Sequence, residues 1–152
     1  SLSLSDNLSS SQMGNVNSDI LSYGLCRGET NMSETEKVQE AIELYFNSMY
    51  ESSEEKVRKV FHPSAKITGF MQGKLLEQSV DQFAAFVAAQ DPSPKEKRDE
   101  ILLETLSMDI MGQTAVARVR DGYIGMVFVD TLSFLKVDDQ WVIYNKLFHV
   151  ES

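Results

Sequence analysis

TAVARVRDGYIGMVFVDTLSFLKVDDQWVIYNKLFH, from Thr114 to His149, is a run of β-branched and aromatic residues interrupted only by short polar turns. Such a run is typical of antiparallel strands that follow one another along the chain. Two turn signals compete in its first half, Asp121-Gly122 and Gly125. We favour Gly125, because it leaves matched strands on both sides. The last turn falls at Asp138-Asp139, so the final strand is expected from Trp141 to Val150.

The residues before this meander predict three helices. Capping boxes, a Ser followed three residues later by Glu or Gln, begin at Ser33, Ser52 and Ser79. Apolar residues at helical spacing follow each box. We expect the second helix to end before Pro63, since a proline disfavours helical geometry in the residue that precedes it.

Further strands complete the order of elements. A hairpin is expected between Lys66 and Glu77, and a long strand from Glu100 to Met111. The order is therefore helix, helix, hairpin, helix and long meander. This order predicts an α+β fold with helices on one face of a curved sheet.

The length of 152 residues and the 42% content of hydrophobic residues fit one globular domain. Residues 1–31 are rich in Ser and Asn, so we expect an N-terminal extension outside the domain, which would span residues 32–152. Deleting the extension should then leave the melting temperature almost unchanged. The alternative is that its weak apolar cluster, Ile20 to Leu25, docks on a neighbour.

Charge and hydropathy exclude several classes of function. The formal net charge of -9 and the pI near 4.7 oppose binding to nucleic acid or to an anionic membrane surface. No apolar run approaches the roughly 20 residues that span a bilayer, and no secretion signal is visible. The single cysteine, Cys26, excludes an internal disulfide. We therefore expect a cytoplasmic protein without nucleic-acid or membrane partners.

Three phrases carry a resemblance to a known superfamily: VFHPSAKITGF (60–70), DGYIGMVFVDTLSFLKVDDQW (121–141) and VIYNKLFH (142–149). With the order of elements, they resemble the nuclear transport factor 2-like superfamily, which includes SnoaL-like cyclases, ketosteroid isomerase and scytalone dehydratase. They look most like its subgroup labelled "putative lumazine-binding". The resemblance covers residues 33–149. It implies a cone-shaped domain with a strongly curved antiparallel sheet, covered on one face by three N-terminal helices, and a homodimer packed through the sheet.

The resemblance also suggests an oxyanion site. Ketosteroid isomerase uses a Tyr on its first helix and a protonated Asp on a meander strand, and Tyr45 and Asp130 fall where these two would lie. The alternation of the strand supports an inward Asp130, because Phe128, Leu132 and Phe134 share its face. The position of the catalytic base is occupied by Gly69 or its neighbours, none of them a carboxylate.

These residues and their neighbours form the candidate site. The candidate catalytic residues are Asp130, Tyr45, His62 and His149. The candidate ligand-binding residues are Phe61, Phe70, Phe86, Phe128, Leu132, Tyr144, Asn145 and Phe148. Asn145 and Lys146 lie on opposite faces of the last strand, so only one can face inward unless the strand contains a bulge.

Each candidate also has a purely structural interpretation. Tyr45 can be a core residue with its hydroxyl at the rim, and Asp130 can be a strand-end carboxylate satisfied by a backbone amide or by Lys146. The two histidines can point to solvent. Together with Asp130 they come from remote segments without metal-ligand spacing, so we expect no metal site. No sequence pattern indicates a cofactor.

Three classes of function remain. The first is a pocket protein that binds a compact, largely apolar or aromatic small molecule. The second is a cofactor-independent lyase, isomerase or hydratase that uses acid/base groups in the pocket. The third is a homodimeric structural or interaction module with a vestigial pocket. The outward residues Val127, Val129, Leu135 and Val137 favour a dimer. The residues leave open whether the pocket is catalytic.

Overall fold

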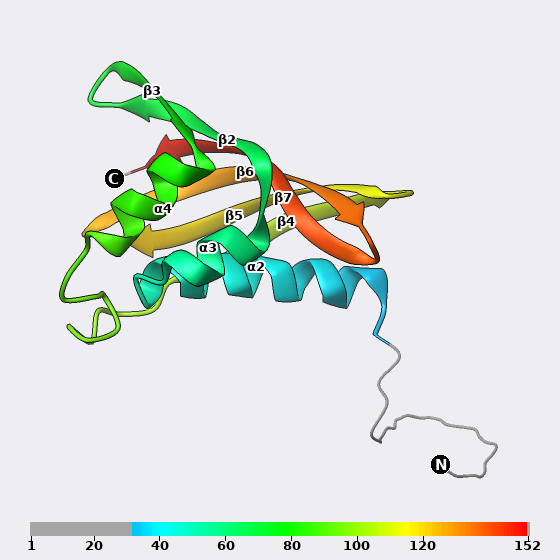
Figure 1. Cartoon of the computed structure of the whole chain (residues 1–152), viewed down its shortest axis with the longest axis horizontal. Helices are drawn as coiled ribbons and strands as arrows, with labels where there is room; N and C mark the ends of the chain where they lie inside the picture. Colours follow the sequence, from blue (N-terminus) through cyan, green and yellow to red (C-terminus); the bar gives the residue numbers. More distant parts are fainter. Residues whose placement is uncertain (1–31, 152) are drawn as a thin grey trace, which may run out of the picture. The chain divides into compact units, whose positions relative to one another are not determined.

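The computed structural model describes residues 32–151, and the expected extension, residues 1–31, lies outside them. These residues include three helices: α2 (Glu34–Tyr50), α3 (Glu54–Val60) and α4 (Val80–Ala88). The strands are β2 (Phe61–Met71), β3 (Lys74–Ser79), β4 (Leu103–Met111), β5 (Thr114–Tyr123), β6 (Met126–Val137) and β7 (Gln140–Val150). Along the chain they follow the predicted order of helix, helix, hairpin, helix and meander (Figure 1).

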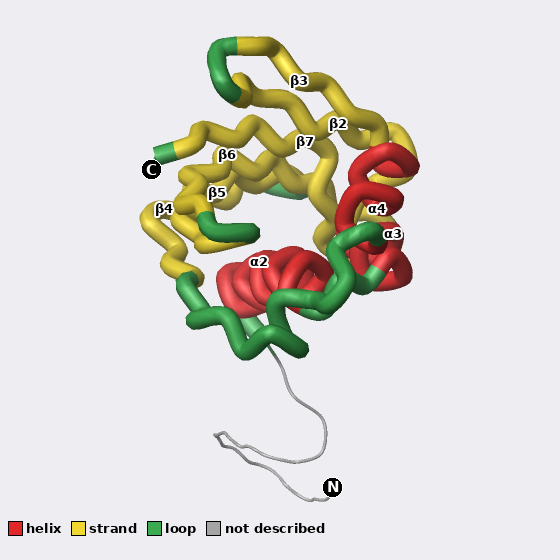
Figure 2. The backbone as a smooth tube through the Cα atoms, turned by 90° about the vertical axis from the view of Figure 1, so that its left-hand side faces the viewer, coloured by secondary structure: helices red, strands yellow, loops and turns green. Residues whose placement is uncertain are grey.

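The six strands form one sheet in the order β3-β2-β7-β6-β5-β4. Four of the neighbouring pairs are antiparallel, whereas β2 and β7 run parallel. The sheet is therefore mixed. The sequence had predicted an antiparallel sheet, and the parallel pair of β2 and β7 corrects that prediction. The parallel pair joins the N-terminal hairpin to the end of the meander. In the end-on view the strands arch over α2, with α3 and α4 at one side (Figure 2).

Local sequence explains where the helices begin. α2 starts at Glu34, directly after the predicted cap Ser33, and α4 has the full predicted capping box between Ser79 and Gln82. The prediction for α3 was wrong by one residue. The hydroxyl of Ser53, not that of Ser52, accepts the amide of Lys56, at 3.2 Å.

The end of α3 also differs from the prediction. The helix stops at Val60 because Phe61 adopts an extended backbone, with φ -98° and ψ 139°. Pro63 then lies within β2, three residues after the helix has ended. The strand thus begins earlier than the predicted Lys66 and carries the proline near its start, a position that a strand tolerates.

The turn at Gly125 is confirmed. Tyr123 pairs with Met126, and Ile124 and Gly125 form the two-residue turn, both with positive φ. The turn at Asp138-Asp139 is confirmed as well, with Val137 paired to Gln140. These two turns set the register of the whole meander, because a shift by one residue would move every side chain to the opposite face.

Two bulges interrupt the regular alternation. In β4, the register shifts between Thr105 and Ser107, which leaves Leu106 43% exposed instead of sharing the inner face of the strand. In β7, Phe134 pairs with Ile143 but Ser133 pairs with Asn145, so Tyr144 is the extra residue. A bulge changes which side chains of a strand face inward from that point on.

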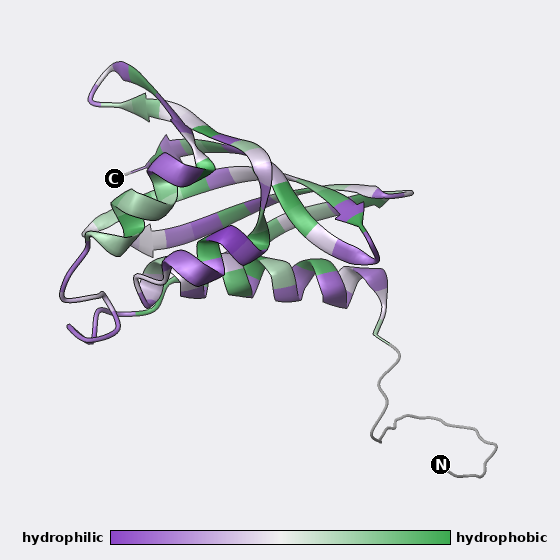
Figure 3. Cartoon of the chain, viewed as in Figure 1, coloured by the Kyte–Doolittle hydropathy of each residue, from purple (hydrophilic) through white to green (hydrophobic). Residues whose placement is uncertain are grey.

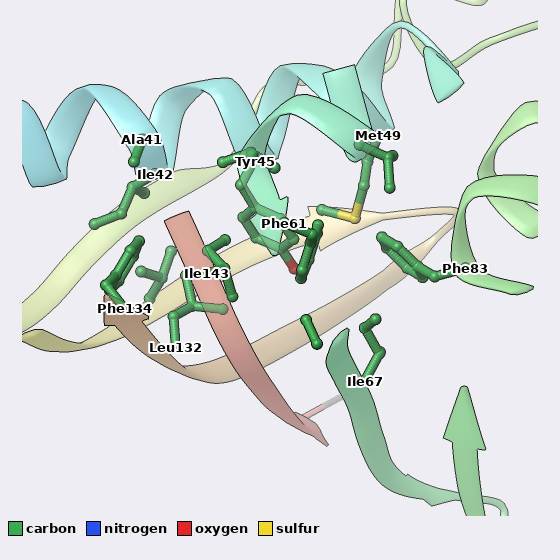
Figure 4. Close-up of a cluster of buried hydrophobic side chains, with 14 of the residues drawn as sticks. Ala41, Ile42, Tyr45, Met49, Phe61, Ile67, Phe83, Leu132, Phe134 and Ile143 are labelled. Carbon is green, nitrogen blue, oxygen red and sulfur yellow. The ribbon is translucent and has the colours of Figure 1, made fainter. Parts of the chain in front are cut away.

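The hydrophobic core lies between α2 and the concave face of the sheet. The inner stripe of α2 contributes Val38, Ile42, Tyr45 and Met49, all of them buried. In Figure 3, hydrophobic and hydrophilic residues alternate along this helix. Facing it, the sheet contributes Leu132, Phe134 and Ile143, which lie together at one end of the cluster in Figure 4.

Candidate functional site

The core opens into a cavity of about 200 Å³ beside Tyr45. Its walls come from α2, α4 and five of the six strands. They are largely apolar: Met49, Ile67, Met71, Leu76, Phe83, Phe86, Ile124, Phe128 and Phe148. The polar lining consists of Tyr45, Gln78, Asp121, Tyr123 and Lys146. An apolar cavity with a few converging polar groups is the usual form of a small-molecule site.

Tyr45 and Asp130 lie together as predicted. The hydroxyl of Tyr45 donates a hydrogen bond to Oδ2 of Asp130 at 2.6 Å, and both residues have no exposed surface. Figure 4 shows Tyr45 reaching from α2 toward the sheet, next to the ring of Phe61. Asp130 lies behind the cavity wall, so Tyr45 is the member of the pair that lines the cavity. The role of the pair as an oxyanion site stays a prediction.

A second carboxyl group, Asp121, lies on the same face of the sheet. Asp130 pairs with Val119 of β5, and Asp121 is two residues further along that strand, so the two carboxyl groups are diagonal neighbours. Asp121 is 1% exposed. Four oxygens here are buried without a hydrogen-bond partner: Oδ1 and Oδ2 of Asp121, Oδ1 of Asp130 and the hydroxyl of Tyr123. Buried polar atoms in a cavity without partners are suited to hydrogen bonds with a ligand.

The two carboxyl groups favour sharing a proton. Desolvation raises the pKa of Asp121 well above its ordinary value, and the negative charge of Asp130 raises it further. Protonation of Asp121 lets it donate a hydrogen bond to Asp130, which removes the repulsion between two buried charges. Burial likewise raises the pKa of Tyr45, and the nearby Asp121 and Asp130 add to the effect. Tyr45 therefore remains a donor at neutral pH.

Lys146 is the cation of the cavity. It is 6% exposed, and its Nζ lies 4.9 Å from the ring centroid of Tyr45, 4.6 Å from that of Phe83 and 5.8 Å from that of Phe148. The bulge at Tyr144 explains this position, because it brings Lys146 and Phe148 to the face that Trp141 and Ile143 occupy earlier in β7. Lys146, not Asn145, therefore faces inward.

Only some of the candidate ligand-binding residues line the cavity. Phe86, Phe128 and Phe148 do so. Phe61 and Leu132 are buried in the core outside the lining. Phe70, Tyr144 and Asn145 are exposed outside it. Phe70 points outward because the inner face of β2 is formed by the alternate residues Ile67, Gly69 and Met71. Tyr144 and Asn145 are displaced by the bulge in β7.

The two histidines, our candidate bases, also lie outside the lining. His149 is exposed on the outer face of β7, opposite Val129, because its neighbour Phe148 points inward. His62 is half-buried, and its ring centroid lies 5.1 Å from that of Tyr144. Its Nδ1 accepts a hydrogen bond from the amide of Ser64. The cavity instead presents Asp121 as its acid/base group.

Asp121, Tyr123 and Lys146 were absent from the predicted site. A signal for the first two was present in the sequence. Once the turn is placed at Gly125, the alternation of β5 brings Asp121 and Tyr123 to the same face as Asp130. We had interpreted Asp121 only as part of a competing turn. No comparable local pattern in the sequence predicts the bulge that turns Lys146 inward.

Residues 32–151 contain no cluster of three or more His, Cys, Asp or Glu side chains that could hold a metal ion. In the same part of the chain, no helix is both long and apolar enough to cross a membrane.

Comparisons with known proteins agree with this architecture. An NTF-2-like protein from Silicibacter pomeroyi DSS-3 superimposes with a TM-score of 0.71 at 24% identity, covering 79% of this chain and 100% of that chain. An NTF2-like protein from Shewanella baltica OS155 superimposes with a TM-score of 0.69 at 24% identity, covering 80% of this chain and 99% of that chain. At these identities the likeness shows the fold.

A curated protein, the aldolase FrzH of a Cladobotryum species, is 25% identical over 117 residues, which cover 77% of this chain and 91% of that protein. The model of a family described as "Putative lumazine-binding" matches residues 33–149, a range that includes the helices, the sheet and the cavity. The chain therefore belongs to this family, and its fold is that of the NTF2-like proteins.

Proposed function

We propose that this domain binds a compact, largely apolar or aromatic small molecule that carries at least one oxygen able to form hydrogen bonds. The observation that carries the proposal is that the buried carboxyl group of Asp121 and the buried hydroxyl of Tyr123 line a largely apolar cavity with hydrogen-bonding capacity that the protein does not fill. Leaving such atoms unpaired costs about 1–3 kcal/mol each. A ligand that forms hydrogen bonds with these atoms regains part of that free energy, whereas in a closed core the cost would remain uncompensated.

The size of the cavity limits the ligand. An apolar cavity of about 150 Å³ in another protein accommodates benzene. The cavity of about 200 Å³ therefore fits a single ring with small substituents. The ring faces of Phe83, Phe128 and Phe148 favour a flat ligand, since aromatic groups pack well against one another.

Matched ligands test the proposal. Phenol and cyclohexanone carry an oxygen on a ring, and toluene has a similar shape without one. We expect the oxygenated rings to raise the melting temperature more than toluene does, and we expect Tyr45→Phe and Asp121→Asn to weaken their binding by about 2- to 10-fold, the effect of one net hydrogen bond. Asp109→Asn, exposed on β4, is the control. Equal binding of phenol and toluene, unchanged in the variants, would contradict the proposal.

A second candidate is a cofactor-independent enzyme that removes a proton next to a carbonyl group. Asp121 supports it, because burial raises the pKa of this carboxyl group and so makes its carboxylate a stronger base than an exposed one. The similarity to a protein named as an aldolase supports it as well, since aldol chemistry begins with such a proton transfer. The hydroxyl of Tyr45 would then turn from Asp130 to donate its hydrogen bond to the developing enolate oxygen.

Exchange of α-protons for deuterium tests this candidate. Incubation of acetone or cyclohexanone in D₂O should give faster exchange with the protein than with buffer, measured by NMR. Asp121→Asn should abolish the difference, and Asp109→Asn should preserve it. If exchange with the parent protein matches that in buffer for every ketone that binds, the domain acts as a binder only.

A homodimer through the outer face of the sheet is a further proposal. This face exposes large apolar side chains: Leu106 43%, Val116 42%, Val137 40% and Leu147 51%. Leu147 lies at its centre, paired with Thr131 of β6 and Thr68 of β2. Sedimentation at micromolar concentration should give twice the chain mass, and Leu147→Glu should give a monomer. A monomer mass for the parent protein would overturn the dimer.

A further inference from the structure

Lys146 has no role in the proposed binding of an oxygen group, yet it is the lysine that lines the cavity. We propose that Lys146 captures an aldehyde or ketone in the cavity as an imine. This inference rests on the proposed function, because it requires that a compact ligand enters the cavity. It narrows the class of ligand to carbonyl compounds and assigns Nζ of Lys146 as the nucleophile.

The first support is the position of Lys146. A lysine on a strand commonly extends to solvent, and Lys66 and Lys74 on β2 and β3 are exposed in this way. Lys146 instead is 6% exposed because the bulge in β7 turns it toward α2. The bulge leaves Tyr144 without a partner in the ladder between β6 and β7 and directs the side chain of Lys146 into the cavity. Bulges recur where a strand aims a side chain into a site.

The second support is the set of groups around Nζ. The rings of Tyr45, Phe83 and Phe148 surround it at 4.6–5.8 Å from their centroids. Among residues 32–151, no carboxylate forms an ion pair with it. The nitrogen is thus held among ring faces without a bound counter-ion, and a ligand in the cavity can approach it.

The rings also suit the product of the reaction. Aromatic faces stabilise a positive charge at this position by cation–π attraction. Condensation with a carbonyl group leaves the positive charge on the same nitrogen, now as a protonated imine. The stabilisation is therefore retained through the reaction instead of being lost when the ammonium group is consumed.

The carboxyl pair provides for the proton transfers. One proton passes from the ammonium group of Lys146 to the carboxylate form of Asp121, the acid/base group that lines the same cavity, which frees the lone pair of Nζ. The lone pair attacks the carbonyl carbon, a C–N bond forms, the π electrons move to oxygen, and one N–H proton passes to that oxygen. The carboxyl group then returns its proton to the resulting hydroxyl, the C–O bond breaks and water leaves. In total, one ammonium and one carbonyl group give one protonated imine and one water.

Reductive trapping tests this inference. The full chain is incubated near neutral pH with a limiting amount of benzaldehyde and with sodium cyanoborohydride, which delivers hydride to the imine carbon. The product is a secondary amine whose mass exceeds that of the protein by one benzaldehyde less one oxygen atom. Peptide mapping then locates the adduct. We expect at least about tenfold more adduct on Lys146 than on exposed Lys66, a modest advantage for a group that reacts with a bound partner.

Two controls separate the possible outcomes. Benzyl alcohol has the same ring without a carbonyl group and should suppress the adduct on Lys146 but not on Lys66. Lys146→Arg should lose the preferred adduct, and Lys66→Arg should retain it. Adducts distributed evenly over exposed lysines, with Lys146 unlabelled, overturn the inference even if Lys146→Arg fails to fold, since the mapping uses the parent chain.

Binding of benzyl alcohol, followed by thermal shift, is measured separately. If benzyl alcohol binds while Lys146 remains unlabelled, the imine is wrong and the proposed binding function stands. If neither benzyl alcohol nor the ring ligands bind, the proposed binding function is wrong, whatever the labelling of Lys146 shows.

Discussion

Replacing Asp121 by Asn should stabilise the ligand-free protein, and the gain should increase with pH. Burial and the neighbouring Asp130 raise the pKa of Asp121 above its ordinary value of 3.8. The folded protein then holds this proton more tightly than the unfolded chain does. Above about pH 4 the unfolded chain loses the proton first, which favours unfolding.

The slope of this effect follows from linkage. While the folded group is protonated and the unfolded group is ionised, stability falls by about 1.4 kcal/mol per pH unit. It becomes flat once the pH passes the pKa of the folded group. Asn binds no proton, so the difference between Asp121→Asn and the parent protein should rise by up to about 2.7 kcal/mol between about pH 5 and about pH 7. The buried amide contributes a constant offset to this difference but no slope.

Urea denaturation at several pH values measures the difference. Asp109→Asn is the matched control, because its carboxyl group is exposed on β4, next to β5. Asp130→Asn should make the fall in stability level off at a lower pH, since it removes the second cause of the raised pKa of Asp121. A difference between Asp121→Asn and the parent that stays constant from about pH 4 to about pH 8 would show that Asp121 ionises in the fold as it does in water, and the reasoning on the carboxyl pair would be refuted.

Three further substitutions test the packing that supports the site. Gly69→Ala should cost about 1–3 kcal/mol of stability in urea denaturation, because the new Cβ would fall on the Phe148 carbonyl oxygen and within 2.6 Å of its ring; an unchanged midpoint would refute this. Glu34→Gln should lower stability at neutral pH, because hydrogen bonds from Lys136 and Trp141 lower the pKa of Glu34 to about 2. Its effect should disappear as the pH falls from about 4.5 toward about 2, and a difference independent of pH would argue against the pairing. Ser79→Ala should lower the free energy of unfolding by about 1 kcal/mol, because it removes the cap of α4, whereas Ser79→Asp should keep most of the stability that the cap provides. Equal denaturation midpoints for the two variants would contradict the role of the cap.

Local features of the sequence were sufficient for most of the fold. The capping box at Ser79 and the turns at Gly125 and Asp138-Asp139 depend on residues that are neighbours along the chain. The alternation of apolar residues in β6 likewise identified Asp130 as inward. The same alternation applied to β5 could have identified Asp121. Such features can be read from sequence because their energies arise within a few residues.

The tertiary structure alone decided the composition of the cavity. The pairing of β2 with β7 is parallel and joins residues about 80 apart in the chain, such as Gly69 and Phe148, so no local pattern reports it. The bulge at Tyr144 arises where β7 must pair with β6 on one side and β2 on the other. It decides that Lys146 faces the cavity and that Asn145 does not. Sequence periodicity assumes regular strands, whereas a curved sheet adjusts its register at bulges that its distant neighbours impose.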